Sequence, residues 1–380
     1  MRNAPRITQK KAFRLNVNTC TNYLTYLMVI VAFMIMQNKV NTGDITSTMK
    51  GQLVPICAYV VAALSLNLTV GILGELSLGH AGFMSVGAFA GAVAASAMRD
   101  SVASEPLRLA IALVIGAAFA AIAGALVGIP VLRLNGDYLA IVTLAFGEII
   151  KSIINNLYIG VDNNGLHASF MKNKIIFAKD AGGRMILSGP MGIPGIKKIS
   201  TFVAGFILIM VALVIIFNLI NSRSGRAIMA LRDNRIAAES VGIKVTKYKM
   251  MGFVISAALA GAAGALFALG QNTIIPSKFD FNMSILILVF VVLGGQGRMW
   301  GSIIAATALT VLPELPEMRD LANYRMLVYA IVLILVMLLT NNPTVKMFVS
   351  SLTVRVKEWF EKAKENRKNK ANKGKGANER

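Results

Sequence analysis

The sequence predicts an all-α, polytopic integral membrane protein with about ten transmembrane helices. Of its 380 residues, 56% are apolar and only 15% are charged, whereas about a quarter of the residues in a soluble domain are charged. The mean hydropathy is +0.64. The apolar residues occur in runs of about 20, the length that a helix needs to cross roughly 30 Å of hydrocarbon. No polar linker divides the middle of the chain, so we assign these runs to one membrane domain.

Ten apolar runs are candidate spans. They cover residues 21–38, 53–73, 76–98, 107–132, 138–159, 201–220, 250–270, 281–297, 299–315 and 326–341. The third and ninth runs are rich in Gly and Ala and border tight turns, so either could be a half-helix. The first run follows a basic N-terminus, as in a signal peptide, but Gln37, Asn38 and Lys39 follow it in place of a small-residue cleavage site. We therefore expect an uncleaved first span.

The net charge of +21 is concentrated in residues 1–22, 223–249 and 346–380. Each of these segments flanks apolar runs, as the positive-inside rule expects of cytoplasmic segments. The charge is therefore better explained by topology than by a nucleic-acid partner. Six spans separate the first basic segment from the second, and four separate the second from the third, so all three fall on one side. We predict that both termini are cytoplasmic.

This topology divides the chain into three parts. Residues 1–22 form a basic cytoplasmic N-terminus, and residues 23–345 form the transmembrane domain. Residues 346–380 form a basic cytoplasmic tail that is expected to be disordered, because it ends in a long stretch with almost no apolar side chains. Residues 160–200 form the longest external loop, which is large enough for a small helix or hairpin.

Small residues recur at four-residue spacing within three of the runs. The stripes are Gly87 and Gly91; Gly124 and Gly128; and Ala257, Gly261 and Ala265. Helices inside lipid associate by close packing, and small residues let their backbones approach. We interpret these stripes as helix-packing surfaces.

Polar side chains inside spans are costly and are therefore candidates for function. Asn67, His80, Thr143 and Glu148 are the candidates here. Three of them also have a structural alternative. His80 can take part in helix packing through a hydrogen bond, Thr143 can bond back to its own helix, and Glu148 can form an ion pair with Lys151 on the same helical face.

Glu75 lies between the second and third runs, close to Ser77. We expect Glu75 at a turn between two spans, where its carboxylate reaches the aqueous interface at little cost.

The sequence contains no motif for a catalytic centre, a nucleotide or a metal. The Gly-rich run 294–301 lacks the Lys-Ser/Thr ending of a phosphate loop and predicts a tight turn between two spans. Two cysteines and two histidines cannot build a typical structural zinc site. We therefore predict no cofactor, no metal and no enzymatic activity, so that any use of ATP requires a partner.

The loop 223–249 is the most informative stretch. Read as one helix, it places Arg232, Arg235 and Glu239 on one face, while Leu231 and Ala238 lie on another. A short amphipathic helix of this kind fits the groove of a partner protein. It fits equally well on a membrane surface, because the basic residues suit lipid headgroups. The residues alone leave both interpretations open.

A resemblance to a known family of proteins favours the first of these two interpretations, docking to a partner. The segment 236–242, IAAESVG, is similar to the coupling-helix motif of ABC importer permeases, with Ile236 in place of the leading Glu. The stretches 65–89, 132–151, 225–249 and 291–306 resemble the branched-chain amino acid permeases of the LivM type. Together these matches span most of residues 60–310, in the same order, which makes the resemblance specific.

The resemblance implies the ABC importer permease fold, in a bacterial inner membrane, and a role in ATP-driven import of leucine, isoleucine and valine. It also implies a homologous second permease, two cytoplasmic ABC ATPases and an external substrate-binding protein as partners. The residues expected to couple to the ATPase are Arg226, Arg232, Asp233, Arg235, Ala237, Ala238, Glu239 and Gly242.

The implied translocation pathway is lined by the four polar candidates, because an apolar amino acid needs a mostly apolar path with a few polar groups. The alternatives are import of urea, short amides or a monosaccharide, transport driven by an ion gradient, and a membrane-embedded enzyme. An ion-driven transporter would require paired carboxylates within the membrane, and only Glu148 comes close.

Overall fold

The computed structural model describes residues 17–43, 46–99, 102–134, 136–162, 165–170 and 184–312, together with residue 331. The chain divides into two units, Met1–Ala322 and Asn323–Arg380, and every element below belongs to the first. Residues 1–16 of the predicted basic N-terminus lie outside the described residues, and its residues 17–22 begin α1. The span at 326–341, except for its residue 331, and the tail at 346–380 also lie outside the described residues.

Most of the described residues are helical, as predicted. The α-helices are α1 (Val17–Thr42), α2 (Ser47–Asn67), α3 (His80–Ala97), α4 (Glu105–Val131), α5 (Asp137–Asn155), α6 (Phe202–Asn221), α7 (Arg223–Asp233), α8 (Arg235–Ser240), α9 (Val245–Ala268), α10 (Phe281–Gly294) and α11 (Met299–Val311). A π-helix, η1 (Leu68–Leu73), continues α2, and two 3-10 turns are η2 (Gly189–Met191) and η3 (Pro276–Lys278).

Seven helical segments within the described residues are long and apolar enough to cross a membrane. They coincide with seven of the ten predicted spans and cover Asn22–Thr42, Ser47–Leu73, His80–Ala97, Glu105–Val131, Phe202–Asn221, Val245–Ala268 and Pro276–Gly294. The predicted span at 299–315 is a shorter apolar helix over its described part, Met299–Val311. The description of the protein as an all-α membrane protein with about ten helices is therefore confirmed.

The predicted span at 138–159 is wrong at its end. Helix α5 stops at Asn155, and the remaining residues enter strand β1 (Leu157–Asp162). Tyr158, Ile159 and Val161 are the aromatic and β-branched residues that favour strands. The apolar run therefore contains two elements.

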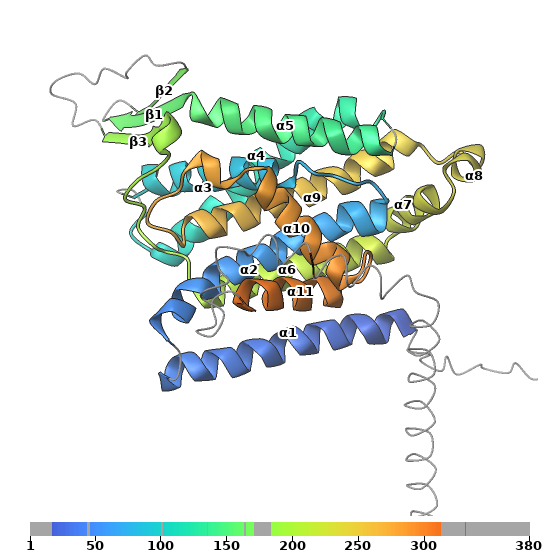
Figure 1. Cartoon of the computed structure of the whole chain (residues 1–380), viewed down its shortest axis with the longest axis horizontal. Helices are drawn as coiled ribbons and strands as arrows, with labels where there is room; N and C mark the ends of the chain where they lie inside the picture. The colour runs from blue at the N-terminus through green and yellow to red at the C-terminus, as the bar shows by residue number, and fades with distance from the viewer. Residues whose placement is uncertain are drawn as a thin grey trace, which may run out of the picture. The chain divides into compact units, whose positions relative to one another are not determined.

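Helix α9 lies at the centre of the first unit and packs against α2, α3 and α4 (Figure 1). The predicted small-residue stripes form these contacts. A Cβ atom added to Gly87 would lie 2.1 Å from the carbonyl oxygen of Gly261, and one added to Gly91 would lie 2.6 Å from the Cβ of Ala265. One added to Gly124 would lie 2.5 Å from the Cβ of Ala257. The small residues allow helices to approach almost to backbone contact, which confirms the packing interpretation.

Helix α1 is peripheral. It packs on α6 through ring contacts, with Phe33 stacked on Phe206 at 4.0 Å between ring centroids and Tyr26 edge-on to Phe217 at 5.4 Å. Leu24, Leu27 and Met34 on its other faces are exposed, as expected of a helix that faces lipid on most sides.

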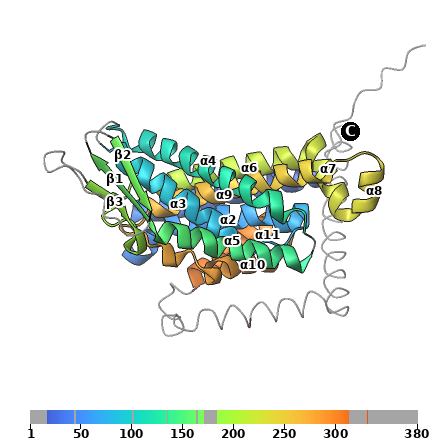
Figure 2. The same ribbon diagram turned by 90° about the horizontal axis from the view of Figure 1, so that it is seen from above.

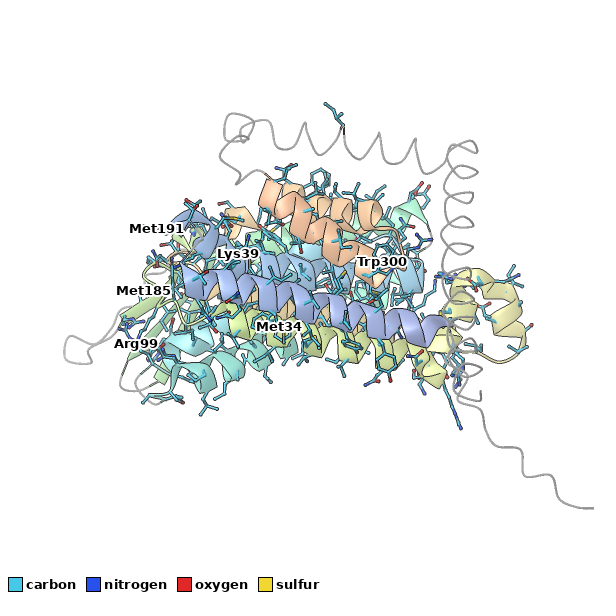
Figure 3. The ribbon with its side chains drawn as sticks, turned by 90° about the horizontal axis from the view of Figure 1, so that it is seen from below. Met34, Lys39, Arg99, Met185, Met191 and Trp300 are labelled. Carbon is cyan, nitrogen blue, oxygen red and sulfur yellow. The ribbon has the colours of Figure 1, made fainter. Side chains whose placement is uncertain are left out.

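A small sheet and the helices α7 and α8 lie at opposite ends of the helix bundle (Figures 1 and 2). The sheet is antiparallel, with strand order β2-β1-β3, and adds β2 (Gly165–Phe170) and β3 (Arg184–Ser188) to β1. It contains the hairpin that was one of the two expectations for residues 160–200. Arg99, Met185 and Met191 lie at this end, and Trp300 lies toward the other (Figure 3).

Candidate functional site

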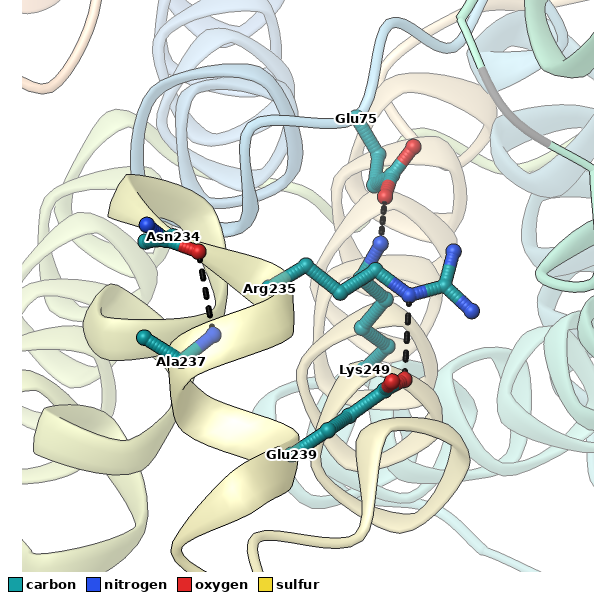
Figure 4. Close-up of polar contacts among 6 residues, drawn as sticks. All are labelled: Glu75, Asn234, Arg235, Ala237, Glu239 and Lys249. Atoms are coloured by element: carbon teal, nitrogen blue, oxygen red, sulfur yellow. Dashed lines mark hydrogen bonds and ion pairs between the residues drawn. The ribbon is translucent and has the colours of Figure 1, made fainter.

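The loop 223–249 forms two short helices and the beginning of α9, not the single helix expected. Ser222 caps the start of α7, where its hydroxyl accepts a hydrogen bond from the Gly225 amide at 3.0 Å. Asn234 then takes an extended backbone conformation, and its side chain caps α8 by accepting from the Ala237 amide at 3.0 Å (Figure 4). Asparagine favours this position because its side chain replaces the missing backbone acceptor. Gly242, at φ 85°, ends the turn after α8.

Two polar contacts fasten this loop to the segment that follows α2. The Arg232 guanidinium donates to the carbonyl oxygen of Gly71 at 2.8 Å. Glu75 and Lys249 form an ion pair in which both side chains are buried (Figure 4). The expectation that Glu75 reaches the aqueous interface was therefore wrong, because Lys249 supplies its counter-charge inside the protein. The loop is thus joined directly to residues 71–75.

The outer face of α8 carries the groups that a partner could contact. Ile236 is 81% exposed and Val241 is 76% exposed. Arg235 and Glu239 pair with each other at 3.1 Å, and both remain largely accessible (Figure 4). Two exposed apolar side chains beside a charged pair make this face a candidate for contact with a partner.

The remaining predicted coupling residues divide between this face and the interior. Ala237 is exposed, whereas Ala238 is 4% exposed and packs inside the chain. Asp233 pairs with Arg232 at 2.9 Å. Arg226 donates to the carbonyl oxygen of Asn221 at 3.1 Å, which ties α7 to the end of α6.

Asn67 joins the end of α2 to the turn between α10 and α11. Its amide nitrogen donates to Ser302 Oγ at 2.8 Å and to the Arg298 carbonyl at 3.1 Å, and its oxygen accepts from the Gly297 amide at 2.7 Å. The turn is the one predicted from the Gly-rich run, and Gly297 adopts φ 81° in it. Every hydrogen-bonding group of the buried Asn67 amide is engaged within the chain.

A chain of hydrogen bonds links His80 to α2 and α9. Thr69 donates to Ser256 Oγ at 2.7 Å, and Ser256 donates to the Ser65 carbonyl at 2.5 Å. Ser65 Oγ lies 2.7 Å from His80 Nε2 and donates its single hydrogen to the Ala62 carbonyl. His80 must therefore donate from Nε2 and leave Nδ1 as an acceptor. This hydrogen bond is the contact that the packing alternative expects of His80.

Two buried polar atoms beside this chain have no hydrogen-bond partner among the described residues, Ser77 Oγ and His80 Nδ1. Ser77 belongs to the non-helical segment 74–79, and His80 is the first residue of α3, which follows it. Irregular backbone at membrane depth is tolerated only where protein buries it or where it borders a hydrated cavity.

Thr143 and Glu148 approach this segment from α5. Thr143 Oγ1 accepts from the Leu78 amide at 3.0 Å and donates to the Ala140 carbonyl at 2.9 Å. Glu148 is partly exposed and pairs with Lys151 at 2.5 Å, as its structural alternative predicted. The structure thus brings Thr143 and His80 to the same segment, while Asn67 bonds the turn between α10 and α11 and Glu148 is partly exposed on α5.

Sequence reasoning missed Ser65, Gly71, Lys249 and Ser256. Lys249 offered a signal, since it is a charged residue at the edge of an apolar run. Gly71 offered none, because its role depends on a carbonyl group and on closeness to Gly297. No group of three or more metal-ligating side chains occurs within the residues that the structure describes.

Comparison with known proteins places this chain in a family. Residues 48–337 match the model described as the branched-chain amino acid transport system / permease component. The chain belongs to this permease family. The permease is 35% identical to the high-affinity branched-chain amino acid transport system permease protein LivM of Salmonella typhimurium, over 83% of its own length and 72% of the relative's. It is 36% identical to the LivM protein of Escherichia coli K12 over the same shares.

A more distant likeness connects the permease to sugar import. It is 27% identical to the ribose import permease protein RbsC of Escherichia coli K12, over 72% of its own length and 78% of the relative's. No solved structure matches it. The family assignment and the seven candidate spans identify a multi-pass membrane permease.

Proposed function

We propose that the permease is the membrane subunit of an ATP-driven importer for leucine, isoleucine and valine. The observation that carries this proposal is the identity of 35–36% to two LivM proteins over 83% of the chain. The lower identity to a ribose permease favours the amino-acid branch over the sugar branch. The proposed location is the inner membrane, with both termini and the proposed coupling loop, residues 223–249, in the cytoplasm.

The energy would come from partners. The expected complex contains a homologous second permease, two cytoplasmic ATPases and an external substrate-binding protein. We assign the ATPase contact to α7 and α8. Ile236 and Val241 would enter a groove of the ATPase, and the Arg235–Glu239 pair would orient the contact.

Arg232 and the Glu75–Lys249 pair would then carry the movement inward. Both fasten α7 and the start of α9 to residues 71–75. This segment leads to His80 and Thr143, two of the four residues proposed for the substrate path. Asn67 and Glu148 complete the proposed path.

Uptake by the reconstituted complex tests the function. In vesicles that contain the permease and its partners, labelled leucine, isoleucine or valine should enter only when ATP is supplied on the ATPase side. Uptake of urea or ribose without amino-acid uptake would contradict the assignment.

A pair of matched variants tests the coupling surface separately. Ile236→Glu should reduce co-purification of the ATPase and ATP-driven leucine uptake by at least about tenfold, because it places a charge in an apolar contact. Met191→Glu, at an exposed apolar residue at the sheet end, is the control and should leave ATPase co-purification unchanged. If α8 instead lies on lipid, Ile236→Glu weakens attachment to vesicles without affecting ATPase co-purification.

A further inference from the structure

Four basic side chains meet at the sheet end of the bundle. Arg99, Arg108, Arg184 and Lys197 line a cavity of about 20 Å³. They come from the end of α3, the first turn of α4, strand β3 and the loop before α6; Arg99 is seen at this end in Figure 3. A cavity of this volume holds about one oxygen-sized group. It lies at the opposite end of α9 from the coupling loop, since Leu269 at the end of α9 also lines it.

Arg108 is the distinctive member of this cluster. It is only 5% exposed, yet no hydrogen bond or ion pair joins its guanidinium to another residue in the described part of the chain. Glu105, three residues earlier on α4, is paired with Lys197 at 2.6 Å and also attracts Arg108 electrostatically, without accepting a hydrogen bond from it. The hydrogen-bond donors of the buried guanidinium are therefore left unpaired within the described residues, which is costly. One carboxylate also stands against four basic groups, so the cavity favours a further anion.

An apolar groove begins beside this cavity. It has a volume of about 630 Å³ and runs between α3, α4, α5 and the sheet. On α3 the groove is lined by Ala94 and the cavity by Ala95; on β3 the groove is lined by Leu187 and the cavity by Arg184. The other groove residues include Ala90, Val93, Phe119, Leu126 and Ile153. All of its lining side chains are apolar.

We infer that the cavity and groove together bind an anionic phospholipid, with a phosphate oxygen at Arg108 and an acyl chain in the groove. Arginine suits phosphate because its planar fork can donate two hydrogen bonds to it. Three more positive charges lie at the cavity, on Arg99, Arg184 and Lys197, and Glu105 supplies one negative charge. This excess favours a headgroup with net negative charge. The groove favours a lipid over a free phosphate or an acidic side chain of a partner protein, because neither of those would fill it.

Lipid binding to the full-length permease tests this inference. Delipidated protein in detergent would be titrated with dioleoylphosphatidylglycerol, and the bound lipid counted by native mass spectrometry. Dioleoylglycerol, with the same chains and no phosphate, should bind at least about tenfold more weakly. Arg108→Gln should weaken phosphatidylglycerol binding by at least about tenfold, as expected for the loss of a charge-assisted hydrogen bond. Arg133→Gln, an exposed arginine at the other end of α4, is the matched control and should have no effect.

Two more variants keep the test decisive. Ala90→Phe fills the groove and should weaken lipid binding while leaving the cavity intact. Arg184→Gln, at an exposed position, should weaken binding even if Arg108→Gln fails to fold. The inference is overturned if inorganic phosphate displaces the lipid and Ala90→Phe has no effect, since the site then binds free anions. It is also overturned if the basic variants weaken only capture of the external binding protein, or if assembly with the second permease removes the lipid.

Discussion

Lys249 and Glu75 are 174 residues apart in the sequence, and their ion pair is buried where α9 begins. A buried pair of this kind is weak evidence for stability as a whole, but loss of one partner leaves an unpaired charge in the interior. The pair therefore fixes the position of residue 75 relative to α9.

A double-variant comparison tests the pair. Glu75→Gln should lower the free energy of unfolding by about 3–5 kcal/mol, because Lys249 then stays buried without a counter-charge. Combining Glu75→Gln with Lys249→Met should recover much of this loss. Glu148→Gln, in the more exposed pair with Lys151, is the control and should change stability by less than about 1 kcal/mol. Unfolding in detergent measures all of them; additive losses in the double variant would contradict the prediction.

Individual residues also show which contacts the sequence predicts and which depend on the fold. Polar residues within apolar runs were correctly selected as unusual, and the pair of Glu148 with Lys151 followed from their spacing on a helix. The partners of Asn67 could not be predicted, since they lie 230 or more residues away and include backbone groups. Spacing along a helix is a local property, whereas these contacts depend on how distant helices pack.

At the scale of elements, the close packing of α3, α4 and α9 depends on glycine. A Cβ atom added to Gly261 would lie 2.3 Å from the Cβ of Ala120 and 2.7 Å from the Gly116 carbonyl oxygen. One added to Gly51, in α2, would have no atom within 4 Å. Substitution of Gly261 therefore changes both helix packing and helix propensity, whereas substitution of Gly51 changes helix propensity alone.

Gly261→Ala should destabilise the permease by about 1–3 kcal/mol, because α4 must move away from α9. Gly51→Ala should be neutral or slightly stabilising, since alanine favours a helix by about 1 kcal/mol over glycine. Thermal unfolding of the two variants in the same detergent provides the measurement. Equal changes in stability for the two variants would mean that the close approach of α4 and α9 at Gly261 does not depend on glycine.

The boundaries of elements were predictable only where the chain signals them. Apolar runs located the helices, and Asn234 is a residue type that often precedes a helix, so the break between α7 and α8 had a local signal. The π-helix η1 and the extended segment before α3 had none, because tertiary contacts at Gly71, Leu78 and Ala81 hold them in place. The loop 223–249 and the polar residues within the apolar runs were each predictable as parts of the candidate site. The contacts that join the loop to residues 71–75 were not.

At the scale of the whole molecule, the predicted topology requires α8 and the sheet end to face opposite sides of the membrane. The structure separates them along the length of α9 (Figure 2). In a cysteine-free background, Ser240→Cys should react with an impermeant reagent only from the cytoplasmic side of sealed vesicles. Lys198→Cys should react only from the external side. Both positions are exposed, and labelling of both from one side would contradict the topology.

The surface of α9 has a mechanical consequence. Over residues 257–265 its contacts with α3 and α4 are made largely by glycine and alanine, so few long side chains interlock there; nearer the start of α9, Phe253 meets Phe83 of α3 edge-on. Displacement along the helix axis therefore does not force large side chains through unfavourable rotamers, and small shear between packed helices is a known mode of conformational change. The residues that let these helices pack most closely are thus also the ones that offer the least steric resistance to a small axial shift of α9.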